Sequence, residues 1–264
     1  MSPLCYNTSV ESARDDSRRS DQQRIKAITF DFWGTLYENG PDLTPQYVRI
    51  LAGSIPGQTA DSLQAALRTA QKLALNVGQM GFRLSVEARV AVVLDELGTA
   101  LPQQDRERLT LALENVLLDV APPLVAGARD VLDSLSRRGY ALGLISDTGM
   151  HPGRVAREVM ARDGILGFFQ HCTFSDELGV NKRWRQPFLA TCLALGVAPD
   201  ETLHVGDLPE TDVRPARAAG LRVALATYVS KRFDGAAAAD IVLSNLADLP
   251  SALAHLLGHG PTGA

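Results

Sequence analysis

The chain has 264 residues, of which 45% are hydrophobic and 21% charged, a balance typical of a folded globular protein. Its net charge of −4 argues against the basic surface that nucleic acid or an anionic membrane would require. The three cysteines, Cys5, Cys172 and Cys192, have no paired spacing, which argues against a disulfide framework and indicates a reducing compartment.

The first 23 residues are polar and contain no apolar segment that could serve as a signal peptide. We expect them to form a disordered leader, with a docking tail as the alternative. No apolar run approaches the ~20 residues of a membrane span, so we expect no membrane partner and a cytoplasmic protein, as a monomer or a homodimer.

The segment at residues 25–37, IKAITFDFWGTLY, organises the rest of the chain. It predicts a short apolar strand that ends at Asp31 and turns at Gly34, with the Thr35 hydroxyl fixing the turn. A strand that is apolar on both faces is typical of a parallel sheet covered by helices. Ligands bind such sheets at the carboxyl ends of the strands, where Asp31 is expected.

Residues 41–122 predict an all-helical insertion. The apolar spacing indicates helices over residues 45–51, 60–77, 85–97 and 104–120, with Ser85 as an N-cap. Pro/Gly segments at both ends favour a mobile lid, and a rigid helical subdomain is the alternative. Within the insertion, Gln79, Arg83 and the loop 78–82 are candidates for substrate selection, although Arg83 could be a solvated loop charge.

From residue 127 onward, helices and apolar strands alternate. The predicted helices cover residues 128–138, 152–163, 185–195, 212–219 and 246–257, and the strands cover 140–145, 172–174, 202–205, 222–226 and 241–243. This order implies right-handed crossovers and a mostly parallel sheet. We therefore predict a Rossmann-like, three-layer α/β core, built from residues 24–40 and 123–258, with the helical insertion at 41–122.

Polar residues follow two further predicted strands. A hydroxyl at a strand end, such as Ser146 before Asp147 and Thr148, can hold a phosphoryl oxygen together with the exposed backbone N–H groups. A turn or N-cap role is the alternative for Ser146. Lys182 is a candidate to neutralise Asp31 and a phosphate together, in preference to its neighbour Arg183.

A pair of carboxylates follows the predicted strand at 202–205. Gly206 permits close approach of the backbone, Asp207 follows at the strand end, and Asp212 comes five residues later. Converging carboxylates form a hard-oxygen site suited to Mg²⁺. The alternative for Asp212 is a plain helix N-cap.

Four motifs in this order resemble the haloacid dehalogenase (HAD) superfamily, in its Mg²⁺-dependent, phosphatase-like branch with an α-helical cap. They are Asp-x-x-Gly-Thr-Leu from Asp31, the strand ending at Ser146, Lys182, and Gly206-Asp207. The resemblance implies a nucleophilic Asp31 that forms an aspartyl-phosphate, with Ser146 and Lys182 as further catalytic residues. It also implies phosphate binding by Ser146, Asp147, Thr148 and Lys182, and Mg²⁺ held by Asp31, the Trp33 backbone carbonyl, Asp207 and Asp212.

Trp33 departs from this family pattern, which usually has a second Asp there as the acid and base. An indole N–H is only a hydrogen-bond donor and cannot take that role. Three explanations remain open. Another residue replaces the acid, with Glu38 and His151 as candidates; the substrate carries a good leaving group; or the protein is a slow or inactive relative that binds phosphates.

These observations predict a Mg²⁺-dependent hydrolase of a small phosphorylated metabolite. Trp33 instead favours the dehalogenase branch, which lacks the Gly-Asp metal motif. The phosphonate-cleaving branch would need a cap lysine, and Lys72 is the only lysine in the insertion. A non-catalytic phosphate-binding protein and a phosphotransferase are the remaining alternatives.

Overall fold

A computed structural model of the chain describes residues 25–258. The polar leader expected over residues 1–23 lies outside the described residues. Within that range, no helix combines the length and the apolar character needed to cross a membrane. Cys172 and Cys192 are both free thiols.

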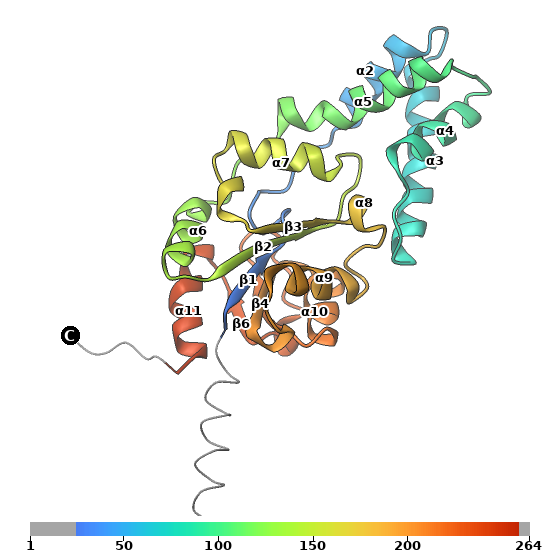
Figure 1. Cartoon of the computed structure of the whole chain (residues 1–264). Helices are drawn as coiled ribbons and strands as arrows, with labels where there is room; N and C mark the ends of the chain where they lie inside the picture. The colour runs from blue at the N-terminus through green and yellow to red at the C-terminus, as the bar shows by residue number, and fades with distance from the viewer. Residues whose placement is uncertain (1–24, 259–264) are drawn as a thin grey trace, which may run out of the picture.

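A six-stranded sheet with the strand order β3-β2-β1-β4-β5-β6 forms the centre of the molecule (Figure 1). Every neighbouring pair is parallel, as the alternation of helices and strands predicted. The strands are β1 (Ala27–Phe30), β2 (Ala141–Ser146), β3 (His171–Phe174), β4 (Thr202–Gly206), β5 (Arg222–Ala226) and β6 (Ile241–Leu243). Because β1 lies between β2 and β4, the residues that follow these three strands meet at one edge of the sheet.

Helices cover both faces of the sheet and complete three layers. On one face, β1 and β2 side chains pack in a shared apolar cluster with α6 (Ala128–Arg137), α7 (Gly153–Arg162) and α11 (Leu249–Leu256). On the other face, α9 (Gln186–Leu195) and α10 (Arg214–Ala218) pack against β2 and β5. Burial on both faces explains why the strand sequences are apolar at almost every position. The predicted three-layer α/β fold is confirmed.

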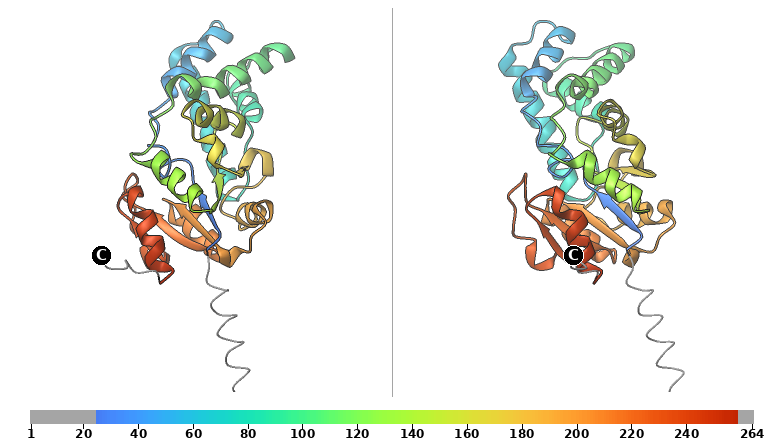
Figure 2. Two further views of the ribbon diagram at one scale, coloured as in Figure 1. Left: turned by 60° about the vertical axis from the view of Figure 1, so that its left-hand side comes forward. Right: turned by 90° about the vertical axis from the view of Figure 1, so that its left-hand side faces the viewer.

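Four helices are inserted between β1 and α6 and have an apolar cluster of their own. These cap helices are α2 (Thr44–Ser54), α3 (Ala60–Gln79), α4 (Val86–Glu96) and α5 (Gln103–Val120). They stand above the α/β core in two further views of the molecule (Figure 2). The Ser85 side chain accepts a hydrogen bond from the N–H of Ala88, so it caps α4 as predicted. The exact boundaries of the insertion, residues 41–122, remain a prediction.

The segment after β4 differs from the predicted helix over residues 212–219. A π-helical turn, Pro209–Val213, comes first, and α10 follows it. Pro209 starts the turn because proline is compatible with the first helical position, where its missing N–H is not needed. Asp212 therefore lies inside a helical turn, and the alternative that it is an N-cap is wrong. A short helix, α8 (Ser175–Leu178), was not predicted.

Candidate active site

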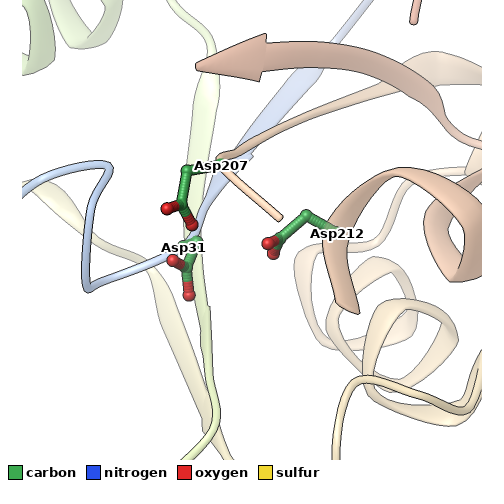
Figure 3. A group of neighbouring side chains, drawn as sticks. All are labelled: Asp31, Asp207 and Asp212. Atoms are coloured by element: carbon green, nitrogen blue, oxygen red, sulfur yellow. The ribbon is translucent and has the colours of Figure 1, made fainter. Parts of the chain in front are cut away.

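Three carboxylates converge at the carboxyl edge of the sheet. Asp31 follows β1, Asp207 follows the neighbouring β4, and Asp212 comes from the turn Pro209–Val213. One oxygen atom from each lies within 4.8 Å of the others, and all three residues are buried. Figure 3 shows the three side chains, with the Asp212 carboxylate directed toward the other two.

Two glycines allow the carboxylates to come this close. Gly34 has φ of 70°, a left-handed conformation that glycine adopts without strain. A Cβ atom at Gly34 would overlap the Asp207 carboxylate, and a Cβ atom at Gly206 would overlap that of Asp212. The glycines of the first and fourth motifs are thus required by the packing of the site itself.

Lys182 bridges two of the carboxylates. Its ammonium contacts Asp31 Oδ1 and lies 2.6 Å from Asp212 Oδ1. Burial alone would lower the pKa of Lys182, but the carboxylates of Asp212, Asp31 and Asp147 outweigh that effect and raise it. Lys182 is therefore a permanent cation in contact with Asp31, whereas no ion pair or hydrogen bond in the described structure links the Arg183 guanidinium to the site.

Asp212 is held by protein groups through both of its oxygens. Oδ1 also lies 3.1 Å from His204 Nε2, and Oδ2 accepts a hydrogen bond from the N–H of Leu208. Burial would raise the pKa of Asp212, but Lys182 and His204 outweigh it and hold the pKa below its usual range. These contacts favour Asp212 as a support that positions Lys182.

The pKa values of Asp31 and Asp207 are raised, in contrast to that of Asp212. Burial is the largest effect on Asp31 and raises its pKa well above the usual value, although Lys182 opposes the shift. Burial and the charge of Asp212 raise the pKa of Asp207 to about 6. A cation bound between Asp31 and Asp207 would stabilise the ionised forms of these two buried carboxylates, so the residues fit a divalent metal. Oxygen-only donors are those that Mg²⁺ prefers.

Residues of the segment after β2 form hydrogen bonds with other parts of the chain. The Asp147 carboxylate accepts a hydrogen bond from the backbone N–H of Lys182, 2.8 Å away, and so orients the lysine segment. Thr148 is bound to the Ser175 hydroxyl through both its N–H and its side chain. Ser146 is buried at the end of β2, with its hydroxyl 3.4 Å from the Asp147 carbonyl. The phosphate-binding roles predicted for Ser146, Asp147 and Thr148 remain predictions. The Asp147 carboxylate already binds a protein group, the Lys182 N–H.

Trp33 does not offer a replacement for the missing acid. Its indole packs edge-on against Phe32, with ring centroids 4.6 Å apart, and lies near Tyr37. The Thr35 hydroxyl is buried and has no hydrogen-bond partner within residues 25–258, so the expectation that it fixes the turn is wrong.

The two other candidates for the acid lie in different surroundings. Glu38 is exposed. His151 has both ring nitrogens engaged, because Nδ1 lies 2.9 Å from the acceptor-only carbonyl of Glu114 and Nε2 lies 3.0 Å from the Tyr47 hydroxyl. Nδ1 therefore carries the proton and Nε2 accepts, which leaves His151 no proton for a leaving group.

Sequence reasoning assigned no role to three residues that the fold brings to the site. His204 is fully buried beneath Asp212, with Nδ1 2.9 Å from the Thr29 hydroxyl. Tyr228 donates to the Thr35 carbonyl and lies close enough to Asp207 and Asp31 for their charges to help raise its pKa, after the larger effect of burial. Asn181, the residue before Lys182, donates a side-chain hydrogen bond to the Gly78 carbonyl of the cap helix α3. Of these three residues, only His204 could have been noticed in the sequence, because it is a polar residue within an apolar strand.

Comparisons with known proteins agree with this geometry. The model of the haloacid dehalogenase-like hydrolase family matches residues 25–220. The phosphoglycolate phosphatase of Rhodospirillum rubrum is 30% identical over 205 residues, which cover 77% of this chain and 80% of that protein. The phosphoserine phosphatase of Thermus thermophilus is 33% identical over 127 residues, covering 48% of this chain and 50% of that relative's length.

A solved structure has the same fold. The 2-haloacid dehalogenase from Pseudomonas syringae pv. tomato superposes with a TM-score of 0.67 at 20% identity, covering 88% of this chain and 99% of that one. The family model spans most of the chain and includes all four motifs at the carboxyl edge of the sheet. The chain belongs to the haloacid dehalogenase-like hydrolase family.

Proposed function

We propose that the protein is a Mg²⁺-dependent phosphatase of small phosphorylated metabolites, which acts through an aspartyl-phosphate on Asp31. One observation carries the proposal: Asp31 and Asp207 converge at the carboxyl ends of adjacent strands, with the Lys182 ammonium against Asp31. Both sequence relatives described above are named as phosphatases, which supports the same reaction class.

The chain's own residues account for most of the reaction. An Asp31 carboxylate oxygen attacks phosphorus, the bond to the leaving oxygen breaks, and that oxygen departs with its electron pair. Lys182 and the Ser146 hydroxyl stabilise the charge of the phosphoryl oxygens. Water then cleaves the acyl phosphate, which releases inorganic phosphate and restores the Asp31 carboxylate.

Asp31, the Trp33 backbone carbonyl and Asp207 would hold the metal, and Asp212 would support them through Lys182. Bound Mg²⁺ supplies electrostatic stabilisation of the negative charge on the transferring group. Without an acid at position 33, the leaving oxygen takes its proton from water or from a group on the substrate. General acid assistance is worth about 10²–10⁴-fold, so activated phosphates are the best substrates under this proposal.

The decisive experiment measures phosphate release from a panel of phosphate esters with Mg²⁺ and with chelator. We expect release only with Mg²⁺, loss of activity in Asp31→Asn, and a beryllofluoride adduct on Asp31. Tight phosphate binding without turnover of any ester would instead identify a non-catalytic binding protein. Transfer of the phosphoryl group to an added alcohol in competition with water would identify a phosphotransferase.

The second candidate function is dehalogenation, because Trp33 lacks the acid that phosphatases of this family use. The Asp207 carboxylate beside Asp31 opposes it, since a halide displacement at carbon needs no metal site. Halide release from 2-haloacids in the presence of chelator would establish this activity. A cytoplasmic location and a monomeric or homodimeric state belong to our proposal and follow from composition alone.

A further inference from the structure

A cavity of about 390 Å³ lies among the cap helices and reaches the loop that follows β2. The side chains that carry its chemistry are Tyr47, Arg68, Arg89 and His151, and the backbone of Gly149 completes the wall on the core side. The catalytic mechanism proposed above uses none of these residues. The cavity volume suits a small metabolite or one end of it.

Arg89 is a half-buried cation without a carboxylate partner. Its Nε donates to the Leu84 carbonyl over 3.1 Å, and no ion pair to Arg89 occurs within residues 25–258. Burial, and then the charge of Arg83, lower the pKa of Arg89 to about 10. A guanidinium kept charged in such a place normally has an anion beside it, because removing an uncompensated charge from water is costly.

Arg83 supplies a second guanidinium without an ion pair in the described residues; it does not line the cavity itself, but it contacts Gly149 of the wall, and its charge acts on Arg89. Its Nε is buried with no hydrogen-bond partner in the described part of the chain, and its Nη2 lies 3.4 Å from the Gly149 carbonyl. Arg83 is therefore not a freely solvated loop charge. The charge of Arg83 disfavours the charged form of Arg89, and an oxyanion at the cavity wall within reach of both would satisfy free N–H donors of each.

The other ionisable groups do not neutralise this charge. Among the described residues that line the cavity, Asp42 is the one carboxylate; it is exposed and accepts a hydrogen bond from the Thr44 N–H. Burial lowers the pKa of His151, so the imidazole is neutral at pH 7. The exposed Arg68 contributes another positive charge at the wall. The net charge of the side chains that line the cavity is therefore positive.

We infer that Arg83 and Arg89 bind a second anionic group of the substrate, a carboxylate or an additional phosphate, on the part of the molecule that is not transferred. The inference rests on the proposed function for the identity of the first group. Gly149 lies three residues beyond Ser146, so their Cα atoms are at most about 11 Å apart. Ser146 and the Gly149 carbonyl that Arg83 contacts thus belong to one short loop, so a small phosphorylated metabolite could contact both parts of it.

The test compares matched esters on the full chain with Mg²⁺: 2-phosphoglycolate, which carries a carboxylate; ethylene glycol bisphosphate, which carries a second phosphate; and ethyl phosphate, which carries neither. We expect kcat/KM of wild type for one of the two charged esters to exceed that for ethyl phosphate by about 10- to 100-fold, the range for hydrogen bonds to a charged group. Whichever charged ester is preferred identifies the anion.

Variants then assign the preference to the arginines. Arg89→Gln and Arg83→Gln should each lower kcat/KM for the preferred charged ester by about 10-fold more than kcat/KM for ethyl phosphate, and Arg89→Lys should retain part of the preference for the charged ester. Arg49→Gln is the matched control, because Arg49 is an exposed arginine of α2 outside the cavity. Equal losses for charged and uncharged esters would overturn the inference.

The wild-type measurement remains decisive if a variant fails to fold. Equal kcat/KM for all three esters would overturn the inference while leaving the phosphatase proposal intact. If no ester is hydrolysed, the phosphatase proposal fails separately, and calorimetric titration with phosphonoacetate then tests the arginines. Binding that weakens in Arg89→Gln and not in Arg49→Gln would support the anion site, and binding unaffected by Arg89→Gln would overturn it.

Discussion

The side-chain amide of Asn181 donates a hydrogen bond to the Gly78 carbonyl near the end of α3, across 2.8 Å. Asn181 immediately precedes Lys182, so this side chain joins the cap helices to the segment that carries Lys182. The Asn181 backbone N–H also donates to the Gly81 carbonyl, and Phe82 pairs with Val180 in an antiparallel bridge. The position of the cap and the position of Lys182 are therefore coupled.

We predict that Asn181→Ala lowers kcat/KM by about 10-fold, because it removes the side-chain hydrogen bond to Gly78 and leaves only the backbone contacts between the two segments. The Lys182 backbone stays bound to Asp147, so the lysine is loosened and not lost. Steady-state kinetics on an activated phosphate ester would check this. Asn245→Ala is the control, since that residue also loses a hydrogen bond, to the Ala247 N–H, away from the site. Equal kinetics in the two variants would contradict the coupling.

Lys182 also stabilises the fold, because two buried carboxylates share its charge. We predict that Lys182→Met lowers the free energy of unfolding by about 3–5 kcal/mol, the cost of leaving buried charges without a partner. Urea denaturation in chelator would measure the loss. Lys26→Met removes a lysine that pairs with Glu201 and is 53% exposed, and should cost less than about 1 kcal/mol. Similar losses in the two variants would show that Lys182 does not balance the carboxylates.

The pKa of Asp207, raised to about 6 by burial and Asp212, predicts how pH affects the metal-free protein. Below about pH 4 the carboxyl is protonated in both folded and unfolded chains. Between about pH 4 and 6 only the folded protein keeps the proton, so the free energy of unfolding falls by roughly 3 kcal/mol as pH rises. Above pH 6 we expect the ionised group to bind added Mg²⁺, and such binding would restore stability by mass action.

Urea denaturation from pH 4 to 8, in chelator and in Mg²⁺, would check both parts of this prediction. Asp207→Asn is the control, because an amide does not titrate in this range and the contribution of this group should disappear. Stability of the chelated protein that rises between pH 4 and 6 by the same amount in wild type and variant would contradict it.

The sequence predicted the parts of the site that depend on strand ends, and missed those that depend on packing between distant segments. Asp31 and Asp207 could be placed because apolar strands of a parallel sheet end at one edge. Asp212 was predicted as a metal ligand or a support of the site, and its carboxylate lies beside those of Asp31 and Asp207. Its hydrogen bonds to Leu208 and His204 depend on a π-helical turn that no sequence period reveals.

The cap is the part of the molecule that local sequence describes least. The helices of the insertion were predicted from apolar spacing, and their ends agree to within a few residues. The same spacing does not show that Arg89 lies near Arg83 or that Asn181 reaches Gly78, 103 positions away. The Asn181–Gly78 contact depends on how the insertion docks on the core, which is decided by long-range packing.

Trp33 offers a direct test of the missing acid. Replacing it with aspartate puts a carboxylate two residues after Asp31, the proposed nucleophile, at the position where the family pattern is expected to have an acid. We predict that Trp33→Asp hydrolyses alkyl phosphates about 100-fold faster than Trp33→Asn, the lower end of the range for general acid assistance. Both variants lose the ring packing against Phe32, so their comparison isolates the proton. Equal rates would mean that the leaving oxygen is protonated elsewhere, and Glu38→Gln would then be the variant to measure.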